Sequence, residues 1–205
     1  MNKSAIFAVM FARKSISDLL IESALIVFGI LLGLYFQDLA DNRETDKKKH
    51  IALQRILKEI SHNEEVIGNA VEVHERIAAR LANVDTLSHY LSTQSPVDIR
   101  RLAGRESIMT TFPRSTSWNA ANASGIISEF EFGDIELFSD CYVMQQAVID
   151  QVTVVAEIIL GGPGPDPSET TARLLMNIQE LEGRERMLLM GYRGTLKKMK
   201  ALSDH

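Results

Sequence analysis

An unbroken apolar run near the start of the chain constrains the fold more than any other feature. Residues 19–36 read LLIESALIVFGILLGLYF, and Glu22 is the only ionisable side chain in this run apart from Tyr35. At a helical rise of about 1.5 Å per residue, such a run spans roughly 27 Å, close to the hydrocarbon thickness of a bilayer, which is about 30 Å. The sequence therefore predicts a single transmembrane helix over residues 17–37.

This run has two alternative interpretations. A cleaved signal peptide has an apolar region of about 7 to 15 residues, followed by a cleavage site with small residues. Here the run is longer and ends in Leu34-Tyr35-Phe36-Gln37-Asp38, which offers no such site. The second alternative, a buried core helix of a soluble domain, stays open. The expected organisation is an interfacial or cytoplasmic segment at 1–16, the transmembrane helix at 17–37 and a membrane-proximal helical domain at 38–205.

The charges on the two flanks of the run do not agree on its orientation. More Lys and Arg follow the run than precede it, which favours a cytoplasmic C-terminal side. The basic residues nearest the run, however, are Arg13 and Lys14 on its N-terminal side, and the first charged residue after it is Asp38. We expect a single-pass protein of the membrane and leave the side of residues 38–205 open.

One face of the predicted transmembrane helix suggests association with a second copy. Glu22, Ile26, Gly29 and Gly33 follow one another at spacings of four, three and four residues, which places them on one helix face. Gly29 and Gly33 form a G-x-x-x-G pair, and small residues at this spacing let two helices approach closely in lipid. We predict that these four residues form the association face and that the protein is a homo-oligomer.

Glu22 itself allows three interpretations. A carboxylate inside the span is costly when it faces lipid. It could reach the headgroups or become protonated, it could face a partner helix, or it could line an ion or proton pathway. The sequence does not decide among the three.

A long amphipathic helix is predicted to continue from the membrane to about residue 92. Neither Pro nor any Gly except Gly68 interrupts residues 37–95, and apolar residues recur there at helical period, with polar exceptions at Asn63 and His74. Packing within the chain explains the stripe, and a parallel coiled coil between subunits is the alternative. The stripe consists of Ile56, Ile60, Ile67, Ala70, Ile77, Leu81, Val84 and Leu91, with Leu53, Leu57, Val71 and Ala78 beside it.

Further helices are expected after residue 95. Ser95-Pro96 resembles a cap that opens a short helix to about Leu102, and Trp118 to Ala123 forms a helical turn that Gly125 ends. Residues 126–132 (IISEFEF) alternate in a way that would suit a strand.

Two longer helices complete the expected fold. The first follows a cap at Asp134 and runs to about Leu160, and the second begins after a cap at Ser168, beyond the Gly- and Pro-rich residues 161–168. The expected fold is all-α: one N-terminal transmembrane helix continues into a long amphipathic helix, which forms a small bundle with the C-terminal helices. The two C-terminal stripes consist of Leu137, Cys141, Met144, Val148, Val152, Val155 and Ile159, and of Leu174, Ile178, Leu181, Leu188, Tyr192, Met199 and Leu202.

The composition argues against several function classes. A formal net charge of −5 disfavours a nucleic-acid partner, because proteins that bind phosphate backbones concentrate Lys and Arg. The single cysteine, Cys141, cannot form an internal disulfide, and its place on an apolar stripe predicts a buried, inert thiol.

No catalytic or metal-binding motif is complete. Glu59-x-x-His62 has the spacing of a helical di-iron ligand pair, but the sequence has no second such pair, so a solvated face is the expected role. No other histidine has a Cys or His at metal-ligand spacing. Gly161-Gly162-Pro163-Gly164 lacks the Lys-Ser/Thr of a phosphate loop. We predict no catalytic residue, no metal and no cofactor.

The start of the chain resembles an uncharacterised family of small bacterial single-pass membrane proteins. The resemblance lies in Glu22-x-x-Leu25-Ile26-Val27-x-Gly29-Ile30-Leu31-Leu32-x-Leu34, followed by Asp38, Asn42-Arg43-Glu44 and a Lys-rich stretch. The family shows N-N-W-N-E where this chain has Gln37-Asp38-Leu39-Ala40-Asp41-Asn42. The resemblance implies a location in the bacterial cytoplasmic (inner) membrane and transfers no catalytic residue.

Three functions are consistent with these observations. The first is a non-enzymatic, membrane-anchored helical scaffold or interaction protein that self-associates through its transmembrane helix, with the lipid bilayer and an unidentified protein as partners. The second is a small oligomeric pore or membrane-acting effector in which Glu22 lines a polar pathway. The third is a membrane-tethered hydrolase, which would need acidic and His side chains from separate helices to converge.

Overall fold

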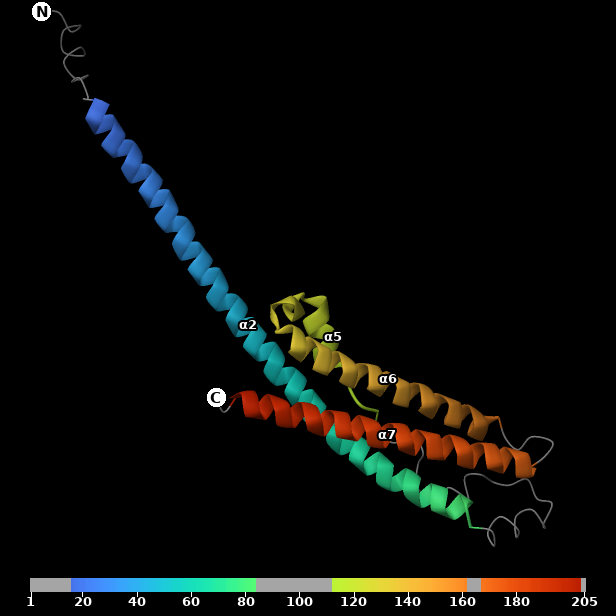
Figure 1. Cartoon of the computed structure of the whole chain (residues 1–205). Helices are drawn as coiled ribbons and strands as arrows, with labels where there is room; N and C mark the ends of the chain where they lie inside the picture. The colour runs from blue at the N-terminus through green and yellow to red at the C-terminus, as the bar shows by residue number, and fades with distance from the viewer. Residues whose placement is uncertain (1–15, 84–111, 162–166, 204–205) are drawn as a thin grey trace, which may run out of the picture. The chain divides into compact units, whose positions relative to one another are not determined.

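The computed structural model describes residues 16–83, 112–161 and 167–203, and in these ranges every regular element is helical (Figure 1). The all-α fold class is therefore confirmed. The chain divides into two compact units, Met1–Lys48 and Lys49–His205, which are described separately here. In chain order the elements are α2 (Ile16–Leu81), α5 (Thr116–Ala123), the 3-10 turn η1 (Ile126–Glu129), α6 (Phe132–Leu160) and α7 (Pro167–Ser203).

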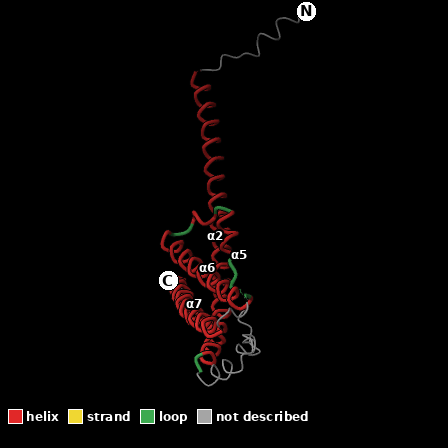
Figure 2. The backbone as a smooth tube through the Cα atoms, turned by 90° about the vertical axis from the view of Figure 1, so that its right-hand side faces the viewer, coloured by secondary structure: helices red, strands yellow, loops and turns green. Residues whose placement is uncertain are grey.

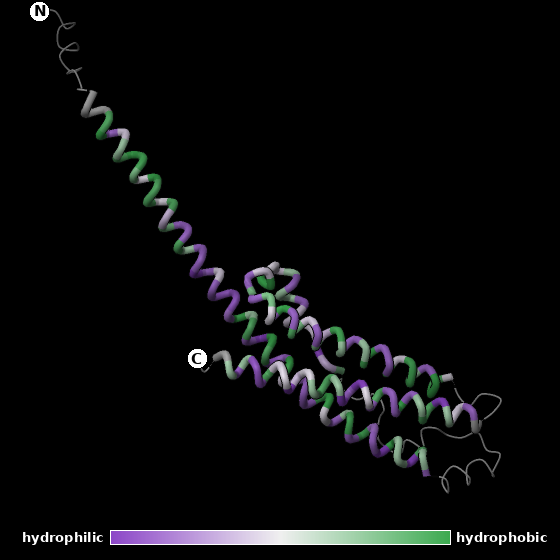
Figure 3. The backbone as a smooth tube through the Cα atoms, in the orientation of Figure 1, coloured by the Kyte–Doolittle hydropathy of each residue, from purple (hydrophilic) through white to green (hydrophobic). Residues whose placement is uncertain are grey.

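The N-terminal unit contains the apolar beginning of α2, which Figure 3 shows as a run of mostly hydrophobic residues, coloured green. Its large apolar side chains are exposed, including Leu20 at 65%, Leu25 at 65% and Phe36 at 61%. No residue in the most apolar 18-residue window of α2 is buried. This part of the helix is long and apolar enough to cross a membrane.

Within the second unit, the later part of α2 lies beside α6 and α7 in a three-helix bundle (Figure 2). The contacts define the directions of the helices. Glu59 and Asn63 of α2 bond Tyr142 and Gln145 of α6, so these two helices run parallel. In contrast, Glu64 and Glu75 of α2 pair with Arg193 and Arg186 of α7, so α2 and α7 run antiparallel.

The predicted apolar stripes form the core of this bundle. Three of them, one from each long helix, meet in a single buried cluster. Because each stripe repeats at helical period, each helix buries one face and leaves the other in water. The predicted stripe residues that are buried are Ile56, Ile60, Ile67, Ala70, Ile77 and Leu81 of α2, Cys141, Val148, Val152 and Val155 of α6, and Leu174, Ile178, Leu181, Leu188, Tyr192 and Met199 of α7.

Helix α6 is also long and apolar enough to cross a membrane by composition alone. In the structure it packs against α7 and contributes a buried face to the core. Two of its buried side chains are polar, Gln145 and Gln151, and both make hydrogen bonds to neighbouring helices. Its apolar window is 28% buried in the bundle, and Val143 and Leu160 of the same helix are exposed.

Gly125 ends α5 as predicted. Its φ of +74° lies in the left-handed region, which side chains disfavour and glycine adopts at no cost. The Ser124 and Gly125 amides bond back to the carbonyls of Ala120 and Asn122, which satisfies the end of the helix. The residues that follow form η1.

The predicted strand at residues 126–132 is wrong. Ile126–Glu129 form a 3-10 turn, in which the Ser128 amide donates to the Gly125 carbonyl over 3.2 Å. The alternation of the sequence does not correspond to two faces of a strand, because Phe130 is buried against Phe138 while Phe132 is exposed at the start of α6. The turn that begins at Gly125 therefore determines the local structure, and the short alternation of apolar and polar residues does not.

Several predicted helix boundaries need correction. α2 ends at Leu81, not near residue 92, with a turn at Ala82; residues 84–92 and the helix predicted from Ser95 lie outside the described residues. α6 begins at Phe132 with Glu131 as its N-cap, so Asp134 lies in the first turn instead of capping it.

The boundary of α7 is also displaced. It begins at Pro167, so Ser168 is inside the helix. The fixed φ of proline suits the first helical position, where its missing N–H is not needed, so Pro167 can start the helix one residue before the predicted cap.

Candidate functional site

The predicted association face lies on an unbroken stretch of α2. Because residues 16–81 are continuously helical, Glu22, Ile26, Gly29 and Gly33 share one face of the helix. A Cβ atom added at Gly29 or Gly33 would meet nothing within 4 Å. The structure therefore leaves these two positions open, and association through them stays a prediction.

In the helical bundle, the carboxylate of Glu59 is the centre of a polar cluster. Its Oε2 accepts a hydrogen bond from the Ser117 amide over 2.8 Å, and its Oε1 accepts one from the Trp118 amide over 3.3 Å. These amides belong to the first turn of α5, whose own N-cap residue, Ser115, makes no side-chain capping bond. A carboxylate from α2 thus caps α5 in place of a local side chain.

Glu59 also binds α6. Tyr142 Oη donates a 2.7 Å hydrogen bond to Glu59 Oε1, and the Tyr142 ring stacks on Trp118 with centroids 5.1 Å apart. Burial and the neighbouring Glu59 carboxylate raise the pKa of Tyr142 far above its ordinary value, so the phenol stays a hydrogen-bond donor. The prediction that Glu59 lies on a solvated face is wrong, because its side chain is only 8% exposed.

A second cluster holds the segment before α5. Asn63 Nδ2 donates to the Arg114 carbonyl over 2.7 Å, and the Arg114 amide donates back to Asn63 Oδ1 over 2.8 Å. Gln145 Oε1 accepts from both Asn63 Nδ2 and Tyr192 Oη, which connects α2, α6 and α7. These bonds fix the backbone of Arg114 while its side chain is exposed.

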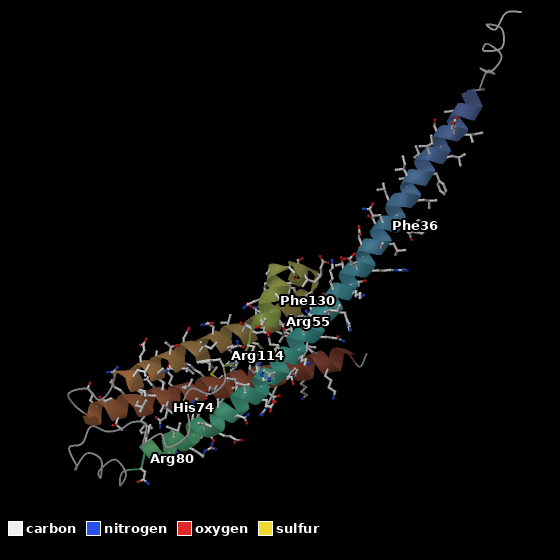
Figure 4. The ribbon with its side chains drawn as sticks, turned by 180° about the vertical axis from the view of Figure 1, so that it is seen from behind. Phe36, Arg55, His74, Arg80, Arg114 and Phe130 are labelled. Atoms are coloured by element: carbon white, nitrogen blue, oxygen red, sulfur yellow. The ribbon has the colours of Figure 1, made fainter. Side chains whose placement is uncertain are left out.

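Between these clusters lies a cavity of about 320 Å³. It is lined by α2 residues from one helix face, by Arg114 and by the start of α5, and Figure 4 labels Arg55 and Arg114 in this region. The lining residues are Arg55, Lys58, Glu59, His62, Arg114 and Ser117.

The cavity is cationic. The Arg55, Lys58 and Arg114 side chains form no ion pair with any residue in the ranges that the structure describes. His62 Nε2 is buried and has no hydrogen-bond partner within residues 16–83, 112–161 and 167–203. Of the described residues that line the cavity, only Glu59 carries a carboxylate, and this carboxylate already accepts three hydrogen bonds.

Another buried polar contact lies deeper in the bundle. His74 Nδ1 lies 2.8 Å from Glu185 Oε2, and the two side chains are 1% and 2% exposed. This contact joins α2 to α7. It is enclosed by the core, so we assign it to the structure of the bundle.

Comparisons with protein-family models, curated proteins and solved structures find no match for this chain. The site is therefore interpreted from its own geometry.

Among the described residues, the remaining candidate ligands do not assemble into a metal centre. His50 bonds to Gln54 on the exposed surface of α2, and His89 and His205 lie outside the described residues. Over residues 16–83, 112–161 and 167–203, no group of three or more His, Cys, Asp or Glu side chains could hold a metal ion.

Cys141 is buried as predicted. Its Sγ lies 3.2 Å from Thr195 Oγ1. Burial raises the pKa of the thiol, with a smaller opposing effect from the Thr195 hydrogen bond. The thiol is therefore protonated at neutral pH and unreactive.

Sequence reasoning missed the cationic cavity. Its α2 members are Arg55, Lys58 and His62. In the sequence they belong to the charged face of an amphipathic helix, which is normally exposed to solvent. The available signal was Asn63, a polar residue within an apolar stripe. Such a residue needs a buried partner, and that partner proves to be the backbone of Arg114.

Proposed function

We propose that this protein is a non-enzymatic helical scaffold anchored in the bacterial cytoplasmic membrane by one helix, through which it self-associates. The observation that supports the anchor is the complete exposure of the apolar window at the start of α2. Burying one large aliphatic side chain is worth about 1.5–3 kcal/mol, so such a run is strongly unfavourable in water. Lipid removes that cost along the whole length of the run.

The helical backbone satisfies its own hydrogen bonds across this stretch, which is the requirement for spanning a bilayer. The resemblance to small bacterial single-pass proteins supports the same location. Glu22 is the one carboxylate in this apolar run. Packing against the transmembrane helix of a second copy would remove its side chain from contact with lipid.

Self-association is supported by the two open glycine positions. Moving an apolar side chain from lipid to a helix interface brings little hydrophobic benefit. Association of helices in lipid therefore depends on van der Waals contact, which is greatest when the two backbones pack closely. Gly29 and Gly33 leave a shallow strip along the helix surface into which a second backbone can fit. Outside the membrane, the bundle provides rigid helical surfaces for a protein partner.

The anchor is tested with the full-length chain expressed in bacteria. After cell breakage, we expect the intact chain in the membrane fraction, resistant to an alkaline carbonate wash and released by detergent. Its mass should equal that of the uncleaved sequence. Recovery of the uncleaved chain as a soluble protein without detergent would overturn the proposal.

Self-association is tested by energy transfer between differently labelled full-length chains in lipid vesicles. We expect dimers or higher oligomers whose affinity falls at least tenfold when Gly29 and Gly33 are both replaced by Leu. A control is Ala24→Leu, which places a leucine on the opposite face of the helix and should leave the affinity unchanged. Energy transfer that is absent in the wild type, or equally reduced by the control, would contradict association through this face.

A further inference from the structure

We propose that the cationic cavity of the bundle binds a small oxyanion carrying a phosphate group. The cavity is bounded by one face of α2, where Arg55, Lys58 and His62 follow at spacings of three and four residues. Arg114 faces this row from the segment that Asn63 holds in place. The site is therefore built from two separate parts of the chain on a rigid support.

The charges in the cavity are unbalanced in favour of an anion. Among the described residues, three permanent cations line it, and Glu59 is the only carboxylate. The carboxylate oxygens are directed to the α5 amides and to Tyr142 Oη, so they are not paired with the cations. An anion in the cavity would relieve the mutual repulsion of Arg55, Lys58 and Arg114, and guanidinium groups match the oxygens of phosphate with paired hydrogen bonds.

His62 provides an independent observation. His62 lines the cavity, and its buried Nε2 atom has no hydrogen-bond partner in the part of the chain that the structure describes. A buried polar atom without a partner costs free energy, so a small rotation of the His62 ring toward an acceptor oxygen in the cavity would be favourable. The surrounding positive charge disfavours a metal cation, whereas an oxyanion can accept hydrogen bonds from both arginines.

The size of the cavity limits the ligand. A volume of about 320 Å³ lies at the low end of the range for small-molecule sites, which is about 300–1,000 Å³. It accommodates inorganic phosphate or a phosphomonoester with a small substituent. A free phosphate in solution and the headgroup of a lipid share this chemistry, and titration with each compound separates the two sources.

The single tryptophan of the chain reports on the site. Trp118 follows Ser117, a cavity residue, and its amide is bonded to Glu59. We would titrate the full-length protein in neutral detergent with inorganic phosphate and, separately, with a short-chain phosphatidic acid. Trp118 fluorescence and calorimetry would be followed at constant ionic strength, with chloride as the control anion.

We expect saturable binding of at least one of the two phosphate compounds and none of chloride. Binding of inorganic phosphate identifies a soluble ligand, and binding of phosphatidic acid alone identifies a lipid headgroup. Arg55→Gln and Arg114→Gln should each weaken binding at least tenfold. Both side chains are exposed and unpaired among the described residues, so neither variant should unfold the bundle.

The matched control is Arg173→Gln, which removes the same charge from an exposed position of α7 outside the cavity. It should bind like the wild type, and circular dichroism should show equal helicity for all three variants. Absence of calorimetric binding for both compounds would overturn the proposal. Binding that survives unchanged in both cavity variants would overturn it as well, whatever the outcome for the membrane anchor.

Discussion

Tyr142 Oη of α6 donates a 2.7 Å hydrogen bond to the same Glu59 oxygen that accepts the Trp118 amide of α5. One carboxylate from α2 thereby connects three helices. It caps α5 electrostatically and holds the ring of Tyr142 against Trp118. The interaction explains how an eight-residue helix with no local capping side chain keeps its place on the bundle.

Removing this carboxylate should destabilise the bundle. We expect Glu59→Ala to lower the free energy of unfolding by about 3 kcal/mol, because two helix amides and a buried phenol lose their acceptor. Glu59→Gln keeps one acceptor oxygen and should cost about half as much. Thermal unfolding of the full-length chain in detergent, followed by circular dichroism, measures both effects.

The control for Glu59 is Glu65→Ala on an exposed position of the same helix. We expect it to change the free energy of unfolding by less than about 0.5 kcal/mol. If Glu59→Ala were equally mild, the capping role of Glu59 would be wrong.

Alkaline pH should unfold the bundle through its buried acids. Burial raises the pKa of Cys141, Tyr142 and Tyr192, whose ordinary values are 9.0 for the thiol and 10.0 for the phenols. Above these values the unfolded chain releases protons that the folded chain retains, so unfolding becomes more favourable. These groups leave stability unaffected below about pH 9, and stability then falls by up to about 1.4 kcal/mol per pH unit for each group.

The slope of this loss provides the check. Denaturant midpoints measured between pH 8 and 11 should fall more steeply above pH 10 than below it. A double variant, Tyr142→Phe with Tyr192→Phe, should be less stable at pH 8 but lose stability less steeply above pH 10. Equal slopes for the variant and the wild type would show that neither phenol is protected by folding.

The contact between His74 and Glu185 should behave as a coupled pair. We expect Glu185→Leu alone to cost about 3–5 kcal/mol, because it leaves the His74 ring in the core without this partner. Replacing both residues by Leu should cost less than the sum of the single changes. A double-mutant cycle by thermal unfolding measures the coupling free energy, and a value near zero would contradict the pairing.

Two glycines should respond to alanine with opposite signs. Gly125→Ala forces a side chain into a left-handed backbone and should destabilise the protein by about 1 kcal/mol. Gly183→Ala lies inside α7, where an added Cβ meets nothing within 4 Å, and should stabilise it by about 0.5–1 kcal/mol. Both changes are measured from denaturant midpoints. A stabilised Gly125→Ala variant would show that the turn after α5 is not left-handed.

The sequence by itself determined the helical class and the core. The period of 3.6 residues in Ile56, Ile60 and Ile67 requires one buried helix face, and the same argument placed Cys141 and Tyr192 inside. The apolar run at residues 19–36 is equally evident from the sequence, because the prediction needs only the length and composition of the run.

Only the tertiary structure decided the roles of Glu59, His62 and Arg114. From the sequence alone, a charged residue on a helix is expected to lie in solvent. The partner that buries Glu59 is the Ser117 amide, 58 positions away, and helical periodicity does not predict this contact. Helical periodicity predicts which face of α2 is buried. It does not predict which distant segment packs beside that face. The cationic cavity exists because the Asn63 side chain bonds the backbone of Arg114 across 51 residues, and long-range contacts of this kind follow from packing, not from local sequence.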